Sequence, residues 1–335
     1  MKPEASILLP VHNAEATLSA ALKSLLRQTF SNFEIIAVDD GSTDGSLKVL
    51  ESLAARDARV RVIHLAERGG IVNALNAGLS EACAELIARM DADDISHPRR
   101  LELQLGYMRQ DENCALLGSA VRLFPRPRLM GGMLHYEKWV NSVATPGEIA
   151  RDLFIESPFP HPSVMFRRDA VLSLGGYRDM GWPEDYDLWL RMARAGMGMA
   201  KLPETLLFWR EGENRLSRAH GMYSPENFRR LKAAFLRDWR LAGARKLQLW
   251  GAGRDGKTWA KLLMQTGFEV VQFIDIDKKK VGGRACGGIP VVWPADIIPG
   301  MPVLCAVGIK GAREQIRDYL TAEGFKEPEE FFFLS

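Results

Sequence analysis

The first hundred residues alternate short apolar runs with longer amphipathic stretches. The apolar runs cover residues 6–11, 34–38, 60–65 and 85–90, and each has the length and composition of a buried strand. Between them, apolar residues recur at helical spacing, and each strand begins about 25 residues after the one before. Strands joined by crossover helices run parallel, with right-handed connections. The pattern therefore predicts an α/β fold with a mostly parallel sheet flanked by helices.

Polar residues follow every one of these strands. They are His12 after the first strand, Asp39 and Asp40 after the second, Arg68, Gly69 and Gly70 after the third, and Asp91, Asp93 and Asp94 after the fourth. The carboxyl ends of parallel strands meet at one edge of a sheet, and ligands bind there. We therefore expect one crevice lined by an acid pair, a flexible basic loop and an acid cluster. Such a crevice suits a nucleotide diphosphate bridged to a metal ion.

The acid cluster lies within residues 87–98, which read I-A-R-M-D-A-D-D-I-S-H-P. Carboxylates packed this closely repel one another unless protons or a cation neutralise them. Oxygen ligands on a short turn suit a hard ion such as Mg²⁺ or Mn²⁺. The other interpretation is an acidic loop before a helix, with Ser96 as the N-cap and Pro98 in the first turn.

The acid pair and the basic loop also allow two interpretations each. Asp39 and Asp40 begin a D-D-G-S-T-D-G run rich in turn formers, in which Ser42 or Asp44 could cap the next helix. Alternatively, one carboxylate accepts hydrogen bonds from a base or ribose. The Arg68-Gly69-Gly70 loop is either a plain turn or a bare backbone beside a cation, which suits a pyrophosphate.

The middle of the chain carries a second pair of acids, Glu184 and Asp185, after a proline. Acidic side chains at a helix N-terminus interact favourably with the helix dipole. A carboxylate at this position can also act as a general base. Trp182 is either a stacking platform for a ligand or a core residue. His161, between two prolines, is either structural or close to the metal or a ligand. Residues 125–141 show no clear period, which predicts a loop that could cover a ligand.

The composition of the chain excludes several protein classes. With 44 Lys and Arg residues against 42 Asp and Glu, no overall field favours nucleic acid. The four scattered cysteines form no CxxC motif and suggest no disulfide framework. No stretch has the length of a membrane span. We therefore expect a cytoplasmic location. The basic amphipathic helix expected over residues 227–241 is either a packed linker or a peripheral contact with the inner face of the membrane.

The last ninety residues contain a glycine-rich loop between two predicted strands. Gly251, Gly253 and Gly256 form a G-x-G-x-x-G pattern, and Asp275 follows about 20 residues later, where it would meet a ribose hydroxyl. This arrangement predicts a small α/β unit that binds a nucleotide or nucleotide sugar, or serves in assembly with an empty loop. The apolar end at 331–334 is expected to pack on this unit or across a contact between copies in a homo-oligomer.

Four motifs resemble those of family 2 glycosyltransferases of the GT-A fold, in order and spacing. They are P-V-H-N, V-D-D-G-S-T-D-G-S, G-G-I-V-N-A-L-N-A-G-L and I-A-R-M-D-A-D-D-I-S-H-P-R-R-L. The resemblance implies inverting transfer of a sugar from a nucleotide-sugar donor, with a UDP-sugar expected, assisted by Mn²⁺ or Mg²⁺. The acceptor would be a hydroxyl of a saccharide or lipid-linked molecule in cell-surface polysaccharide or glycoconjugate synthesis. The final ninety residues resemble small Rossmann-like modules of sugar-modifying enzymes.

The same resemblance assigns roles to residues of this chain. Those expected to bind the donor are Pro10, His12, Asp39, Asp40, Arg68, Gly70 and Asp91. Asp93, with Asp91, would hold the metal; Asp185 would be the base, and Glu184 would hold an acceptor hydroxyl. On this interpretation Trp182 could stack on a sugar ring of the acceptor, His161 could approach the acceptor, and the predicted loop at 125–141 could cover it. Many members have an arginine where this chain has Leu75, so Arg68 or Arg89 is expected to substitute for it. Residues 208–210 and 214–217 resemble a strand and loop near the diphosphate.

The predicted domains are residues 1–222, a linker helix at 223–244, and residues 245–335. Two other functions compete with sugar transfer. An NAD-dependent sugar-modifying oxidoreductase would use the C-terminal glycine loop, but no Tyr-x-x-x-Lys or catalytic histidine pattern follows it. A non-catalytic nucleotide-sugar-binding protein would keep the fold without turnover. The intact D-x-D motif at Asp91 and Asp93 and the Glu184-Asp185 pair disfavour it.

Overall fold

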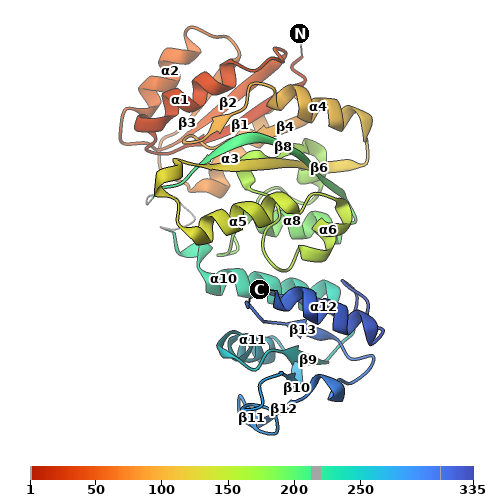
Figure 1. Cartoon of the computed structure of the whole chain (residues 1–335). Coiled ribbons are helices and arrows are strands. Elements are labelled where there is room, and N and C mark those ends of the chain that lie inside the picture. The colour runs from red at the N-terminus through yellow and green to blue at the C-terminus, as the bar shows by residue number, and fades with distance from the viewer. Residues whose placement is uncertain (1, 213–219, 310) are drawn as a thin grey trace. The chain divides into compact units, whose positions relative to one another are not determined.

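The computed structural model describes residues 2–212, 220–309 and 311–335, which form two compact units (Figure 1). The first unit holds residues 2–149, 158–180 and 184–212. The second holds residues 150–157 and 181–183 together with the described residues from 220 to the C-terminus. None of the helices in these described ranges combines the length and the hydropathy needed to cross a membrane.

An eight-stranded sheet forms the centre of the first unit, in the order β3-β2-β1-β4-β7-β6-β8-β5. Its first four strands in the chain are β1 (Ala5–Val11), β2 (Phe33–Asp40), β3 (Val60–Leu65) and β4 (Leu86–Arg89). These four pair in parallel, and helices α1 (Glu15–Leu26), α2 (Ser46–Ala54) and α3 (Ile71–Glu81) connect them. The predicted alternation and the mostly parallel sheet are therefore confirmed.

The helices cover both faces of this sheet because strand side chains alternate between faces. One face packs against α1, α2 and α4 (Arg100–Gln110) through a single core cluster: Ile7, Leu9, Ile35, Ala37, Leu18, Leu22, Leu25, Leu50, Leu101 and Leu105. The opposite face packs against α3. A Cβ added to Gly78 of α3 would lie 2.2 Å from Leu8 of β1, so this close approach requires glycine.

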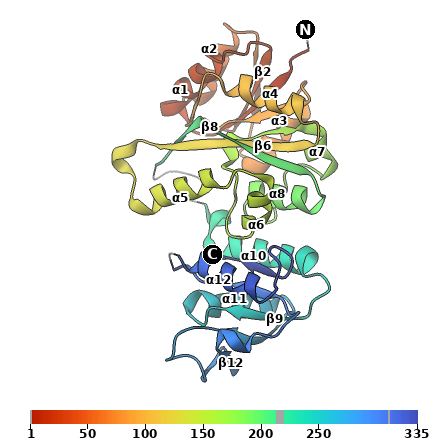
Figure 2. The same cartoon turned by 45° about the vertical axis from the view of Figure 1, so that its right-hand side comes forward.

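The remaining strands extend the sheet past β4. The long strands β6 (Cys114–Phe124) and β8 (Gly198–Arg210) run parallel to each other, as Figure 2 shows, and β7 (Met165–Arg167) pairs antiparallel with β4 and β6. The short strand β5 (Ile95–Ser96) pairs antiparallel with β8. Ser96 therefore lies in a strand, and α4 begins at Arg100. The alternative interpretation of Ser96 as a helix N-cap is wrong, because the backbone of this segment pairs with β8.

Residues 125–141 are largely helical, so the predicted loop is wrong. They contain η1 (Arg126–Arg128) and most of α5 (Gly131–Ser142). Glu137 of α5 accepts a hydrogen bond from the backbone of Leu123 (2.6 Å), and Asn141 bonds to both backbone groups of Val121 (2.9 and 2.8 Å). These bonds to β6 stabilise α5. Its helical spacing of apolar residues was not apparent in the sequence because the helix begins with two glycines.

Short helices complete the first unit. They are α6 (Pro146–Asp152), η2 (His161–Ser163), α7 (Arg168–Ser173) and α8 (Glu184–Arg194), of which α6 ends within the segment that belongs to the second unit. Helix α8 begins with Glu184 and Asp185 and buries Leu188, Trp189 and Met192. Its amphipathic pattern therefore holds two acids at a fixed helix start.

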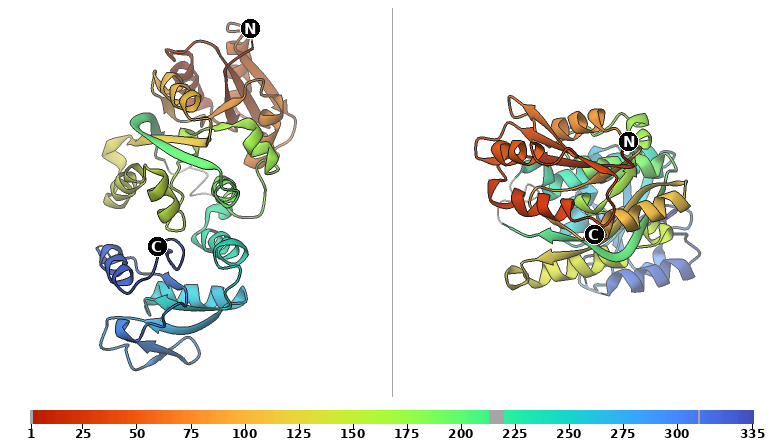
Figure 3. Two further views of the ribbon diagram at one scale, coloured as in Figure 1. Left: turned by 90° about the vertical axis from the view of Figure 1, so that its right-hand side faces the viewer. Right: turned by 90° about the horizontal axis from the view of Figure 1, so that it is seen from above.

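The second unit contains a six-stranded sheet in the order β11-β12-β10-β9-β13-β14. Its strands are β9 (Lys246–Trp250), β10 (Glu269–Ile274), β11 (Arg284–Ala285), β12 (Ile289–Val292), β13 (Val303–Cys305) and β14 (Phe331–Phe333). All pairs except β11 with β12 are parallel. Figure 3 shows α11 (Arg254–Gln265) and α12 (Ala312–Ala322) flanking these strands, and η5 (Pro294–Asp296) precedes β13.

The range predicted as a linker belongs to the second unit. It carries η3 (Gly221–Tyr223), α10 (Pro225–Phe235) and the π-helical turn η4 (Leu236–Arg240). Lys232 of α10 is buried and donates hydrogen bonds to the carbonyl oxygens of Ile155 (2.6 Å) and Leu334 (3.1 Å). The apolar end of the chain is likewise buried, within this unit's own sheet.

Candidate active site

The loops after β1, β2 and β3 meet at one edge of the first sheet. The ring nitrogen Nδ1 of His12 lies 2.8 Å from the carbonyl oxygen of Asp40. The two carboxylate oxygens of Asp40 accept hydrogen bonds from the backbone N–H groups of Gly69 (2.7 Å) and Gly70 (2.9 Å). Asp40 is 4% exposed, so its carboxylate fixes the basic loop rather than facing solvent.

Two glycines let these loops approach each other. Gly41 has φ +61°, and a Cβ there would lie 2.7 Å from the backbone nitrogen of Arg68. Gly70 has φ +84°, which side chains rarely adopt. The exposed side chain of Arg68 has no ion pair within the described residues and is available to a ligand.

Asp39 is fully buried and pairs with a residue that the sequence did not single out. Its Oδ2 lies 2.9 Å from Nδ1 of His64 and 3.4 Å from the backbone nitrogen of Ser42. His64 lies beside Asp39 because β2 and β3 pair in that register. Within the described structure, Oδ1 of Asp39 is buried without a hydrogen-bond donor, which is uncommon for a carboxylate oxygen.

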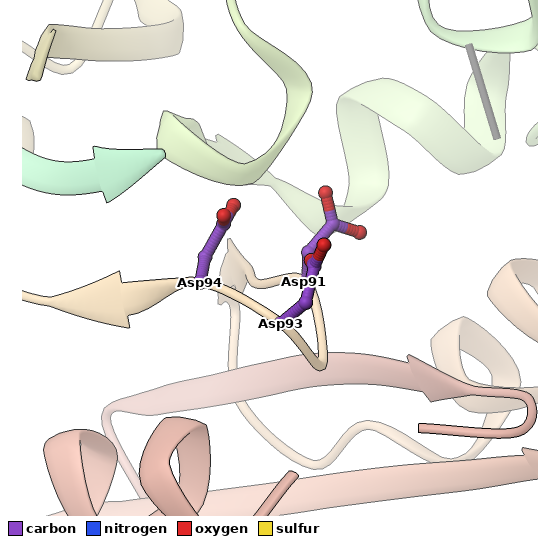
Figure 4. Close-up of side chains that lie close together, drawn as sticks. All are labelled: Asp91, Asp93 and Asp94. Carbon is purple, nitrogen blue, oxygen red and sulfur yellow. The ribbon is translucent and has the colours of Figure 1, made fainter. Parts of the chain in front are cut away.

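The acid cluster after β4 forms a compact turn. One carboxylate oxygen from each of Asp91, Asp93 and Asp94 lies within 4.8 Å of the others. Figure 4 shows the three side chains rising from the same side of the turn. This all-oxygen donor set fits a hard divalent cation.

Arg210 at the end of β8 distinguishes the three acids. Its backbone nitrogen donates to Oδ1 of Asp94 (2.6 Å), and its Nε donates to the carbonyl oxygen of Asp93 (2.5 Å). Asp94 is 1% exposed, whereas Asp91 and Asp93 are half-buried. Asp94 therefore holds the turn against β8, whereas Asp91 and Asp93 are more exposed to solvent.

Arg89 lies buried beneath this turn and forms an ion pair with Asp91. Burial lowers the pKa of Arg89, but Asp91 and Glu184 help to raise it by more, so the guanidinium stays charged. At 4% exposure it neutralises part of the acid cluster from within. Of the two arginines expected to substitute at Leu75, only Arg68 is exposed; Leu75 itself is a core residue.

Glu184 and Asp185 lie at the start of α8, close to the buried polar groups of His161 and Arg89. Glu184 is 2% exposed and Asp185 is half-buried. Burial, and then the charge of Glu184, raises the pKa of Asp185, while Arg89 lowers it. A carboxyl group whose pKa is raised towards neutrality is suited to accept a proton.

His161 supports Glu184 from η2. Its Nδ1 lies 3.6 Å from Oε1 of Glu184, and its Nε2 lies 2.9 Å from the hydroxyl of Tyr177. Burial and the charge of Arg89 lower the pKa of His161 to about 4, so its ring is neutral near pH 7. With 6% exposure, His161 acts here as a buried contact of Glu184.

Asn76 fixes the turn that carries Tyr177. Its side-chain amide donates to the carbonyl oxygen of Tyr177 (2.9 Å) and accepts from its backbone nitrogen (3.0 Å). Arg191 of α8 donates to the carbonyl oxygens of Leu174 (3.0 Å) and Gly176 (2.9 Å). Hydrogen bonds therefore link the turn at residues 175–177 to both α3 and α8, a role that its G-G-Y sequence did not reveal.

The remaining predicted site residues lie in β1, in the second unit or outside the described residues. Pro10 is buried within β1 opposite Val38, and Trp182 belongs to the second unit. The loop at 214–217 falls outside the described residues. The four residues of the predicted second site, Gly251, Gly253, Gly256 and Asp275, lie together in the second unit between β9 and the end of β10.

A family model described as Glycosyl transferase family 2 matches residues 6–175, which is half of the chain. The chain belongs to this family. EpsE of Bacillus subtilis (strain 168) is 33% identical over 229 residues, covering 67% of this chain and 79% of that protein. The amylovoran biosynthesis glycosyltransferase AmsE of Erwinia amylovora is 34% identical over 218 residues, covering 64% and 79%. The matched family range ends before α8, so the roles of Glu184 and Asp185 rest on geometry.

Solved structures share the fold of this glycosyltransferase. S. aureus TarS 1–349 in complex with UDP-GlcNAc gives a TM-score of 0.55 at 18% identity, covering 78% of this chain and 71% of that one. The mannosyltransferase PcManGT from Pyrobaculum calidifontis, in complex with GDP-Man and Mn²⁺, gives 0.50 at 20% identity, covering 70% and 62%. The first unit therefore has the expected GT-A type of sheet flanked by helices, and the NAD-dependent oxidoreductase loses its support.

Proposed function

We propose that this glycosyltransferase catalyses inverting, divalent-metal-dependent transfer of a sugar from a nucleotide-sugar donor to a hydroxyl acceptor. The observation that carries the proposal is that the buried charge of Arg89 acts both on the acidic turn at 91–94 and on the Glu184-Asp185 pair. Asp91 forms an ion pair with this buried arginine, and the same charge acts on Glu184, His161 and Asp185. A cation-binding turn and a general base thus share one electrostatic environment.

Donor binding is supported by the edge that follows β1 to β4. The buried Asp39 would support the base-binding loops through His64 and Ser42, and the exposed Arg68 can bind a diphosphate beside Gly70. The related folds of TarS and PcManGT have been solved with UDP-GlcNAc and GDP-Man respectively. We propose a UDP-sugar as the donor and a saccharide or lipid-linked hydroxyl as the acceptor.

Asp91 and Asp93 would hold the divalent ion. When bound, such an ion neutralises the charge that develops on the departing diphosphate. The buried Arg89 fixes the Asp91 carboxylate, and Arg210 fixes the backbone at Asp93, so both ligands are positioned before the donor arrives.

Asp185 would act as the base. In a single displacement, the acceptor oxygen forms a bond to the anomeric carbon as the bond to the diphosphate oxygen breaks, and attack from the opposite face inverts the centre. The acceptor proton passes to the Asp185 carboxylate, whose raised pKa favours holding it. Glu184, supported by His161, would orient the acceptor hydroxyl.

A donor panel tests this proposal. The full chain is incubated with UDP-, GDP- and dTDP-sugars and Mn²⁺, and released nucleoside diphosphate is measured, with EDTA as the control. We expect slow release from one donor class that EDTA abolishes. The proposal fails if no donor is turned over, or if release is unchanged in EDTA.

A further inference from the structure

We propose that the second unit binds a small phosphate-bearing ligand in a basic pocket at the glycine loop, at a site distinct from the donor site. The pocket has a volume of about 460 Å³, within the usual range for small-molecule sites. Its lining includes Gly253, Thr258 and four cationic side chains: Arg254, Lys257, Lys261 and Lys280. Among the described residues, none of the side chains that line it is acidic, which favours an anionic ligand.

The three glycines of the loop serve different purposes. Gly251 has φ +107°, and a Cβ there would lie 2.8 Å from the carbonyl oxygen of Ala306. A Cβ on Gly256 would lie 1.8 Å from the carbonyl oxygen of Gly251. These two glycines are required for packing. Gly253 is different, because a Cβ there would meet nothing within 4 Å, and this residue lines the pocket.

The cations of the pocket are largely free of acidic partners. Arg254, Lys257 and Lys261 have no ion pair within the described residues, whereas Lys280 pairs with Asp275 (3.0 Å) and Asp277 (3.6 Å). The acid on the same helix, Asp255, is paired with Arg229 (3.1 Å). Three uncompensated charges on the first two turns of α11 repel one another, and a bound phosphate would relieve that repulsion.

Asp275 indicates which part of a ligand is recognised. Its Oδ2 accepts from the backbone nitrogen of Ala252 (2.8 Å) and from Lys280 (3.0 Å), and its Oδ1 accepts from the backbone nitrogen of Asp277 (2.9 Å). At 7% exposure, this carboxylate supports the loop. Asp275 therefore supports the loop and Lys280, and we infer that recognition rests on the cations that would bind phosphate.

Calorimetric titration of the full chain in EDTA tests the proposal, with inorganic pyrophosphate, UDP and ADP as separate probes. The variant Arg254→Gln/Lys257→Gln/Lys261→Gln removes the unpaired charges. The matched control Lys278→Gln/Lys279→Gln/Lys326→Gln removes the same charge from residues outside the pocket lining. We expect saturable pyrophosphate binding that weakens at least tenfold in the pocket variant and less than twofold in the control.

A second variant guards against misfolding of the first. Gly253→Val places a side chain in open space, with an extended backbone that valine adopts, and should block binding at unchanged circular dichroism. UDP and ADP binding equal to pyrophosphate would assign recognition to phosphate alone, and tighter nucleotide binding would add the nucleoside. Absence of saturable binding, full binding by Gly253→Val, or equal loss in the matched control would overturn the proposal.

Discussion

The guanidinium of Arg89 forms an ion pair with the carboxylate of Asp91 while remaining 4% exposed. The arginine is on β4 and the acid is in the turn that follows, so the strand fixes the charge beneath the candidate metal site. The same charge lowers the pKa of His161 and favours the ionised form of Asp185. One buried cation therefore couples the acid turn to the start of α8.

Replacing this cation should change both stability and the pH profile. In Arg89→Met, Asp91 and Glu184 lose their buried counter-charge, and we expect the free energy of unfolding to fall by about 2–4 kcal/mol. The pKa of Asp185 should rise, so the acidic limb of the pH–rate profile should move to higher pH. Urea denaturation and the pH dependence of donor turnover measure the two effects. Arg89→Lys, which keeps the charge, should leave the limb in place; a limb equally displaced in both variants would contradict the coupling.

Glu184→Gln should move the same limb in the opposite direction. Burial and the Glu184 charge raise the pKa of Asp185, so removing that charge lowers it. A base must be deprotonated to act, so turnover should persist to lower pH in this variant, even if its maximum falls. The position of the limb, fitted independently of the maximum rate, is the measurement. An unmoved limb would show that Asp185 does not control it.

Asp185→Asn should remove transfer while leaving donor binding intact. The amide cannot accept the acceptor proton, and we expect turnover to fall by about 10²–10⁴-fold, the usual contribution of a general base. Donor affinity, measured by calorimetry, should change by less than about twofold, since the base serves the acceptor. Asp169→Asn, an exposed acid in the first turn of α7, is the matched control and should transfer normally. Normal transfer by Asp185→Asn would remove this residue from the mechanism.

Asp93→Asn and Asp94→Asn should fail in different ways. Asp93 offers a half-buried carboxylate to a cation, so its amide variant should lose Mn²⁺-stimulated turnover. Asp94 accepts the backbone N–H of Arg210, and its replacement should lower the free energy of unfolding by about 1–3 kcal/mol. Mn²⁺ titration in the presence of donor and urea denaturation distinguish the two. The division of roles is wrong if Asp94→Asn is as stable as the wild type and fails to bind Mn²⁺.

Local periodicity was sufficient for much of the first unit. Residues 6–90 specify strands and helices through spacing alone, and their order places His12, Asp40 and the acid turn at one edge because strand ends in a parallel sheet coincide. The helical part of 125–142 was missed because its stability comes from side chains that bond to β6, which lies outside any local window.

The sequence by itself determined most of the first sheet, the edge where we expect ligands to bind and the residue types available there. Only the tertiary structure decided the role of each residue. Asp40 accepts hydrogen bonds from the basic loop, Asp94 accepts one from the backbone of β8, and His161 contacts Glu184. The physical reason is that burial and hydrogen-bond partners come from segments far apart in the chain. A carboxylate that binds a cation and one that fixes a backbone look identical in sequence, and differ only in what surrounds them.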